Sequence, residues 1–323
     1  MNHPRVTVLL LTYNTAELVE AAIAGALAQT VPCRILVSDD ASPDGTGERI
    51  ERALAGYDGP HEVRVFRNPA NLGLGAHLSA RMTDACGEIV VLMAGDDVSY
   101  PDRAARMLEV FDADPAVMVA GGGYDRVDDD GHDLGLSHAR VPARFDIHHF
   151  ANAGRFTTLL GASMAFRREV FERFGPLRAV VEDNALTMRA MLLGTGVQLP
   201  APLIRYRISS SSLSGWVFAK GDRSSEAFVR RYRRMIRMYR DVADDLDHAL
   251  TRVDGLPADR VRAGRQLAGM YRLEAEQREV ILDRPRREWI APLWRGLARP
   301  GLRRKSLERA AKLLLPRAWF GAG

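Results

Sequence analysis

Two adjacent carboxylates, Asp96 and Asp97, follow the apolar run Ile89 to Met93. At the end of a buried strand two adjacent carboxylates repel each other in partly desolvated surroundings. Their repulsion destabilises the fold unless a cation or hydrogen bonds neutralise the charges. Mg²⁺ and Mn²⁺ suit the pair because they prefer oxygen ligands and bridge carboxylates to substrate phosphates. Position alone leaves a second interpretation open, in which the pair is a turn before a helix that starts near Pro101.

Two further acidic pairs stand in comparable positions. Asp39 and Asp40 follow a second apolar run and enter a loop rich in Ser, Pro and Gly. Such a loop is most often a capped turn, but acids at a shared sheet edge often bind the base or ribose of a nucleotide. Glu182 and Asp183 open a helical pattern, where one acid can cap the helix and the other is left to project elsewhere.

The stretches around these acids predict alternating strands and helices. Short apolar runs predict strands, and apolar residues spaced by three or four predict helices. Asn14 is predicted to cap the first helix, with Glu17 as its reciprocal partner. Strand and helix alternation with short connections indicates a parallel sheet covered by helices, with ligands beyond the carboxyl ends of the strands. The predicted strands are 6–11, 35–37, 63–66 and 88–93, and the predicted helices lie between them, the second and third over 48–54 and 76–85.

The pattern is looser after residue 120 and turns helical after about 224. Strands are predicted at 117–120, 163–166 and 203–208, a hairpin at 121–135, and helices at 167–174, 182–193, 227–250, 259–282 and 303–315. We therefore predict two domains, an α/β domain over 1–215 and a basic, mainly helical region over 216–323. No apolar run approaches the ~18 residues of a membrane span or the core of a signal peptide.

Charge is divided unevenly over the 323 residues. The formal net charge is +4, but residues 1–219 carry 20 basic and 27 acidic side chains, whereas residues 220–323 carry 25 and 14. Such asymmetry indicates a different partner for each part. The two cysteines, Cys33 and Cys86, are too few for a disulfide framework and indicate a reducing compartment. There is no Gly-x-Gly-x-x-Gly after the first strand, no Walker A motif and no Gly-x-Ser-x-Gly elbow.

Five motifs, taken in order and spacing over about residues 5–215, resemble family 2 glycosyltransferases of the GT-A fold. They are Val6 to Asn14, Val37 to Thr46, Asn71-Leu72-Gly73, Leu92 to Asp97 and Glu182-Asp183. Met164 to Phe171, followed by Gly175, and Leu203 to Arg207 are also similar to the family. The resemblance implies a nucleotide-diphospho-sugar transferase fold, with a mostly parallel, Rossmann-like sheet, flanking helices and a C-terminal helical region.

The resemblance also implies roles for individual residues. Asp183 would be the general base that deprotonates an acceptor hydroxyl, which attacks the anomeric carbon from the face opposite the diphosphate, so that the configuration inverts. Asp96 would bind ribose and diphosphate and contribute with Asp97 to a Mn²⁺ or Mg²⁺ site, which neutralises the leaving diphosphate. The nucleotide would be held by Thr12, Tyr13, Asn14, Asp39, Asp40 (on the base), Gly73 and Asp96, while Glu182, Ser163 and Arg207 would lie on the acceptor or donor-sugar side.

Two departures from the family pattern bear on the metal. Many members have Asp-x-Asp-Asp, and Ala94 stands at the first of these positions. Many also place a histidine two residues after Arg207, where this chain has Ser209. The expected cation site is therefore the shorter Asp96–Asp97 form, with water in place of a ligand from the last strand.

The basic C-terminal region lies outside the resemblance. Residues 284–317 carry 11 basic and 2 acidic side chains. The segment from Arg286 to Phe320 suits an interfacial amphipathic helix that contacts anionic headgroups or a polyprenyl-linked acceptor, whereas 224–282 is more typical of a packed helical bundle. The apolar positions that suggest membrane contact are Trp289, Ile290, Leu293, Trp294 and Leu297. No motif supports nucleic-acid binding.

The sequence thus predicts an inverting, metal-dependent glycosyltransferase of surface polysaccharide, lipopolysaccharide or glycolipid biosynthesis. UDP or dTDP sugars are the expected donors, a glycan or polyprenyl-linked hydroxyl is the expected acceptor, and the expected location is cytoplasmic, at the inner face of the membrane. Two alternatives stay open: a sugar-1-phosphate nucleotidyltransferase, weakened by the missing Gly-rich triphosphate loop, and a non-catalytic sugar-nucleotide-binding module. The sugar, the acceptor linkage and any homo-oligomer are not readable from the residues.

Overall fold

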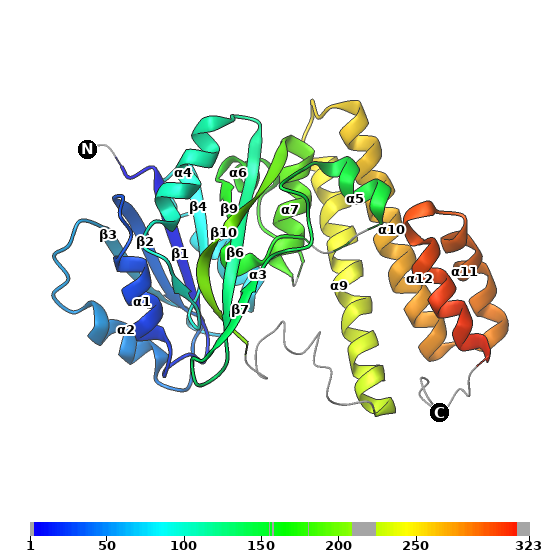
Figure 1. Cartoon of the computed structure of the whole chain (residues 1–323), viewed down its shortest axis with the longest axis horizontal. Helices are drawn as coiled ribbons and strands as arrows, with labels where there is room; N and C mark the ends of the chain where they lie inside the picture. Colours follow the sequence, from blue (N-terminus) through cyan, green and yellow to red (C-terminus); the bar gives the residue numbers. More distant parts are fainter. Residues whose placement is uncertain (1–2, 155, 157, 180, 209–223, 315–323) are drawn as a thin grey trace. The chain divides into compact units, whose positions relative to one another are not determined.

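The computed structural model describes residues 3–154, 156, 158–179, 181–208 and 224–314 (Figure 1). The chain divides into two compact units. Residues 1–146 and 157–208 form the sheet unit, and residues 147–156 and 209–323 form the helical unit. The boundary expected at residue 215 and the position of Ser209 lie outside the described residues.

One ten-stranded sheet forms the centre of the sheet unit, in the order β3-β2-β1-β4-β9-β6-β10-β5, with β7 paired to β6 and β8 to β10. β1 runs parallel to both β2 and β4, and β2 runs parallel to β3. β9 is antiparallel to its neighbours β4 and β6, whereas β6 and β10 are parallel. The strands are β1 Val6–Thr12, β2 Cys33–Asp39, β3 Glu62–Arg67, β4 Ile89–Ala94, β5 Val98–Ser99, β6 Val117–Val127, β7 Asp133–Ser137, β8 Arg144–Phe145, β9 Ala165–Arg167 and β10 Thr195–Arg207.

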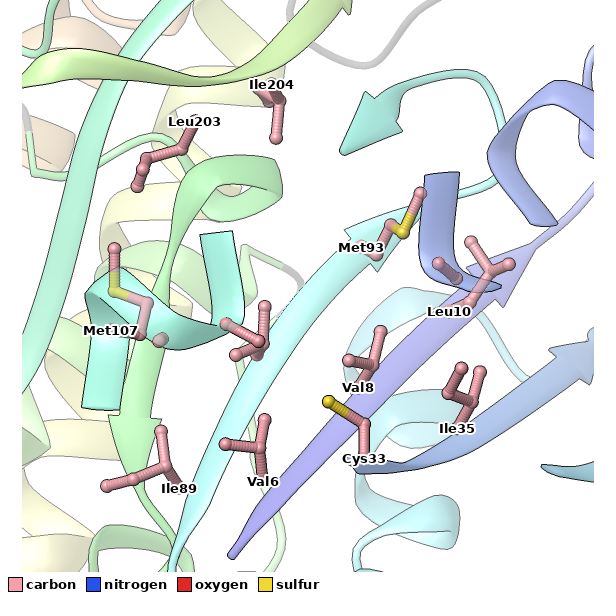
Figure 2. Packing of buried hydrophobic residues seen from close by; sticks show 14 of the residues in the cluster. Val6, Val8, Leu10, Cys33, Ile35, Ile89, Met93, Met107, Leu203 and Ile204 are labelled. Atoms are coloured by element: carbon pink, nitrogen blue, oxygen red, sulfur yellow. The ribbon is translucent and has the colours of Figure 1, made fainter. Parts of the chain in front are cut away.

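The apolar runs of the sequence form the buried centre of this sheet. All seven residues of β1 and of β2 are buried, as are the first five of β4. Figure 2 shows Val6, Val8 and Leu10 of β1 packed beside Cys33 and Ile35 of β2 in the main apolar cluster. Strands covered on both faces need no polar alternation, which is why each reads as a continuous apolar run.

Helices cover the sheet, α1 and α2 against β1, β2 and β3, and α3, α4 and α7 against β1, β6 and β10 (Figure 1). Within β6, Gly122 allows close packing, because a Cβ there would lie 2.3 Å from Cγ of Leu203. The predicted hairpin forms between β6 and β7. The helices are α1 Val19–Leu27, α2 Thr46–Leu54, α3 Leu74–Arg81, α4 Arg103–Ala113, the 3₁₀ turn η1 Gly161–Ser163, α6 Glu169–Phe174 and α7 Glu182–Leu193.

The helical unit consists of α5 Ile147–Ala153, α9 Ser225–Arg252, α10 Ala258–Asp283, η2 Arg286–Trp289, α11 Ile290–Leu297, η3 Pro300–Leu302, α12 Arg303–Ala310 and η4 Ala311–Leu314. Glu274 of α10, fully buried, forms ion pairs with Arg278 and Arg309. These two cations hold the pKa of Glu274 at about 2, in spite of its burial. Among the described helices, none has the length and apolar composition needed to cross a bilayer.

The structure corrects part of the expected membrane-facing surface. Trp289 is 0% exposed and Leu293 is buried, both packed against Val280 and Ile281 of α10. These two side chains belong to the core of the helical unit, because each stands one residue before an exposed side chain, Ile290 or Trp294, and one residue rotates about 100° around a helix. Residues 315–320 of the predicted segment lie outside the described residues.

Candidate active site at the switch point of the sheet

The sheet reverses its strand order at β1, since β2 follows on one side and β4 lies on the other. Open α/β sheets bind ligands beyond the carboxyl ends of the strands at such a switch point. Thr12 pairs in register with Asp39, and Leu11 with Ala94. The sheet therefore brings the end of β1, Asp39 and the turn after β4 to one edge.

Asp39 organises the loop that follows β2. It is buried, accepts hydrogen bonds from the Ser42 hydroxyl and, at 3.1 Å, from the Ser42 backbone N–H. The Thr12 hydroxyl lies 3.4 Å from the same carboxylate, and the Arg67 guanidinium lies 3.7 Å away. Hydrogen bonds from several donors fix this buried carboxylate in place.

Asp40 clamps a second loop to the site. Its Oδ1 accepts from Asn68 Nδ2 at 2.7 Å and from the Leu72 N–H at 2.9 Å, and its Oδ2 accepts from the Gly73 N–H at 2.9 Å. The side chain is 2% exposed. A carboxylate has about four lone-pair positions, so the predicted contact to a nucleotide base would have to use the one that remains.

The loop after β1 presents Tyr13 and holds Asn14 in an unusual conformation. Tyr13 is 47% exposed, and Asn14 has a φ of 54°. The predicted capping role of Asn14 is wrong, because α1 begins at Val19 after Leu18 and receives no side-chain cap. Partners from the loop after β2 satisfy the backbone N–H groups of residues 14, 15 and 16 instead, namely Ser42 Oγ, Thr46 Oγ1 and Asp44 Oδ2.

Glu17 was expected as the reciprocal capping partner and instead pairs with Arg49 of α2. The sequence misses this arrangement because the partners of the β1–α1 loop stand about 30 residues away along the chain. The two loops are thus joined directly above the edge formed by β1 and β2.

The acidic pair after β4 has the features of a cation site. Asp97 is 2% exposed; its Oδ1 accepts the Arg207 backbone N–H at 2.9 Å, and its Oδ2 has no hydrogen-bond partner among the described residues. Burial raises the pKa of Asp97 well above its usual range, and the Asp96 carboxylate adds to the shift. Burial also raises the pKa of Asp96.

An orphaned, buried carboxylate oxygen beside a second carboxylate is unfavourable unless a cation completes its surroundings. All the available donors are oxygens, which hard divalent ions prefer. The residues of this turn therefore fit a Mg²⁺ or Mn²⁺ ion.

Arg207 supports this site through its backbone. Its Nη1 donates to the carbonyls of Asp128 at 2.8 Å and Asp129 at 2.7 Å, in the turn between β6 and β7. This places the guanidinium in the hairpin turn and the backbone N–H on Asp97. Arg207 therefore connects Asp97 to the β6–β7 turn. The predicted contact to a sugar would require the guanidinium to leave its carbonyl partners.

Arg103 is a charged neighbour that sequence reasoning missed. It is fully buried on α4, and its Nη2 donates to the carbonyls of Leu92 at 2.6 Å and Met164 at 3.2 Å. Burial lowers the pKa of Arg103 to about 9, and the charge of Asp97 opposes that shift. One arginine among 42 carries no signal in the sequence, because only the fold shows that it is buried behind the acidic pair.

Glu182 and Asp183 form a second acidic pair at the start of α7. Asp183 accepts from the Asn184 backbone N–H at 2.6 Å and side-chain amide at 3.1 Å. Gly161 leaves room for the pair, since a Cβ there would lie 2.6 Å from Oε1 of Glu182. Burial raises the pKa of both carboxyls, Glu182 to about 8 with a contribution from the charge of Asp183, and Asp183 to about 6.

The 3₁₀ turn η1 lies between the Glu182–Asp183 pair and β4, the strand that precedes Asp96 and Asp97. It begins at Gly161 and leads to Met164, whose carbonyl accepts the Leu92 N–H of β4 at 3.0 Å. Ser163 within this turn is buried, and its hydroxyl lies 3.1 Å and 3.3 Å from the carbonyls of Leu160 and Gly122. Because the hydroxyl is committed to the backbone, this geometry does not present Ser163 to a sugar.

The sheet topology, its switch point and the flanking helices define a GT-A fold. Two solved structures share it: the mannosyltransferase PcManGT of Pyrobaculum calidifontis in complex with GDP-Man and Mn²⁺ (19% identity, 98% of this chain and 88% of that one, TM-score 0.53), and TarS of S. aureus in complex with UDP-GlcNAc (17% identity, 98% and 89%, TM-score 0.61).

The chain belongs to glycosyl transferase family 2, whose sequence model matches residues 7–175. The succinoglycan biosynthesis protein ExoO of Rhizobium meliloti is 35% identical over 186 residues, which are 57% of this chain and 49% of that protein. The chain spans about half to two thirds of the length of the curated relatives it matches.

Proposed function

We propose that the chain transfers a sugar from a nucleoside diphosphate sugar to a hydroxyl of a glycan or lipid-linked acceptor in bacterial surface-polysaccharide biosynthesis. Membership of family 2 and the similarity to a succinoglycan biosynthesis protein support the reaction class and the setting. The observation that carries the proposal is the orphaned Oδ2 of Asp97 beside Asp96 at the switch point of the sheet. This feature suits a cation bound together with a diphosphate.

The chain's own residues supply the donor site in this proposal. Asp97 and Asp96 would hold a Mn²⁺ or Mg²⁺ ion, which supplies neutralisation of the negative charge that develops on the leaving diphosphate. Thr12, Tyr13 and the loop clamped by Asp40 would hold the nucleoside, with the exposed Tyr13 ring available for contact with a base. Structural neighbours bind GDP-Man and UDP-GlcNAc. The proposed donors are UDP and dTDP sugars.

Asp183 is the proposed general base. It would accept the proton of the acceptor hydroxyl while the oxygen attacks the anomeric carbon and the diphosphate leaves from the opposite face, so that the configuration inverts. Its pKa of about 6 fits this role, because a base with a raised pKa is stronger and is still largely ionised near pH 7. The proposed site of action is the cytoplasmic face of the membrane, where a lipid-linked acceptor would be reached.

A thermal-shift panel tests the donor site. UDP, dTDP, GDP and CDP are each added with and without Mn²⁺ to the wild type and to the Asp97→Asn variant, with Glu109→Gln on the exposed side of α4 as matched control. A ligand at about 100 times its Kd stabilises by about 2.7 kcal/mol, which corresponds to about 5–10 °C for a unit of this size. We expect one nucleotide to stabilise the wild type and the control only with Mn²⁺, and Asp97→Asn to lose the shift.

Asp183→Asn then separates an enzyme from a binding module. We expect turnover of the matching donor sugar to fall by about 10²–10⁴-fold, the usual contribution of a general base, with the nucleotide shift unchanged. Equal loss of nucleotide binding and turnover would mean that Asp183 has a structural role. If no nucleotide shifts the wild type in the presence of Mn²⁺, the transferase proposal is overturned.

A further inference from the structure

The outer face of α11 exposes two large apolar side chains one helical turn apart. Ile290 is 63% exposed and Trp294 is 71% exposed, and residues four apart lie on the same face of a helix. Leu293, on the adjacent face of α11, packs with Trp289 of η2 in the core of the helical unit. The outer pair is therefore not part of the interior that holds the helix in place.

Basic side chains stand next to this pair. Arg286 and Arg287 are exposed and lie four and three residues before Ile290, one turn away. Residues 284–317 carry 11 basic side chains against 2 acidic ones, and of these Arg295, Arg304 and Arg309 pair with Glu276, Glu308 and Glu274. Exposed apolar side chains next to arginines are typical of helices that lie in the plane of a bilayer surface.

We propose that this outer face of α11 (Ile290 and Trp294 with Arg286 and Arg287, the α11 face) docks the chain onto an anionic lipid bilayer. The indole of Trp294 and the side chain of Ile290 enter the interface, where tryptophan is favoured because its ring is apolar with one polar edge. The two guanidinium groups contact the phosphates of the headgroups.

Charge complementarity selects this occupant over a second copy of the chain. In a two-fold dimer the same patch meets itself, so the excess positive charge of one copy would face that of the other. Like charges across an interface oppose association, whereas an anionic bilayer attracts each arginine. The inference does not depend on the proposed sugar transfer, because lipid binding needs neither donor nor acceptor.

Flotation with lipid vesicles tests the inference on the full chain without nucleotide. Vesicles of phosphatidylcholine mixed with phosphatidylglycerol are compared with vesicles of phosphatidylcholine alone. We expect binding to the anionic vesicles, weakened by added salt, and little binding to the neutral ones.

Two double variants examine the two kinds of contact. Arg286→Gln with Arg287→Gln should lower the partition coefficient about 30-fold, about fivefold for each arginine. Ile290→Ser with Trp294→Ser should lower it by at least about tenfold. The matched controls are Arg52→Gln on α2 and Leu136→Ser on β7, which is 49% exposed, and both should bind like the wild type. Unchanged thermal unfolding of every variant shows that folding is intact.

Equal binding of the α11 variants and the wild type would overturn the inference, as would equal binding to neutral and anionic vesicles or no binding at all. A dimer in solution that Ile290→Ser with Trp294→Ser converts to a monomer would also overturn it in favour of a second copy. None of these outcomes affects the nucleotide shifts, so the two proposals fail separately.

Discussion

One substitution at Asp40 can distinguish its role in holding the loop of Asn68 to Gly73 from a role in nucleotide recognition. In Asp40→Asn the amide oxygen can keep the bonds from Asn68 and Leu72, but the amide nitrogen then faces the Gly73 N–H, donor against donor. The unsatisfied N–H costs about 1–3 kcal/mol. Converting two charge-assisted bonds to neutral ones costs about 1 kcal/mol each, which gives about 3–5 kcal/mol in total.

This loss is large enough to measure directly. For a domain of 150–250 residues each kcal/mol lowers the Tm by about 2–4 °C, so the Tm should fall by roughly 6–20 °C. Urea unfolding followed by circular dichroism gives the free energy itself. Asp58→Asn, an exposed acid before β3, is the matched control and should stay within about 0.5 kcal/mol of the wild type.

A variant as stable as the wild type would contradict the clamp. If Asp40→Asn unfolds like the wild type and yet loses nucleoside diphosphate binding, the carboxylate reads the base and does not clamp the loop. Asn68→Ala gives an independent check, because it removes one of the three bonds and leaves both backbone donors in place, for an expected cost of about 1–2 kcal/mol.

Three further predictions concern the loops and the acidic pair of the candidate site. Gly95→Ala should destabilise by about 1–3 kcal/mol in urea unfolding, because the added Cβ would lie 2.8 Å from Cγ2 of Thr12, and an unchanged midpoint would mean that the turn yields. Ala41→Gly should stabilise by about 1 kcal/mol in the same assay, because Ala41 has a φ of 59°, and any loss would show that its methyl group is needed. Donor turnover should rise with pH through about 6 as the Glu182–Asp183 pair gives up its first proton, and a rate independent of pH between 5 and 7 would remove the base from this pair.

The central parallel strands could be predicted because β1, β2 and β4 are local apolar runs, whereas the short β5 and β8 were not predicted. Val6–Leu11 and Glu88–Met93 were predicted within one or two residues of β1 and β4. The helix of Glu182 to Leu193 was predicted with the observed bounds. These elements are specified by side chains that are neighbours in sequence, so a short window contains the information.

Features that depend on distant partners were not predictable. Asn14 has the right residue type for a cap, but its loop is held instead by Ser42 and Thr46, whose hydroxyls accept the backbone N–H groups of residues 14 and 15. The interior position of Trp289 follows from α10, and the buried charge of Arg103 follows from the approach of α4 to the acidic turn. In each case the deciding partner stands far away in the sequence, so that a short window of residues does not contain it.

The placement of α5 limits how this protein can be divided, in the laboratory or in evolution. Residues 147–156 are inserted between segments of the sheet unit, yet they pack with the C-terminal helices. The Phe156 ring lies tilted against those of Tyr239 and Tyr271, and the Gln266 side chain donates to the Ala151 carbonyl. A chain shortened to residue 208 would keep Phe150 and Phe156 but lose their cover, and should aggregate. A recombination event that exchanges the C-terminal helices would have to exchange this insertion as well, so the two segments should be inherited as one piece.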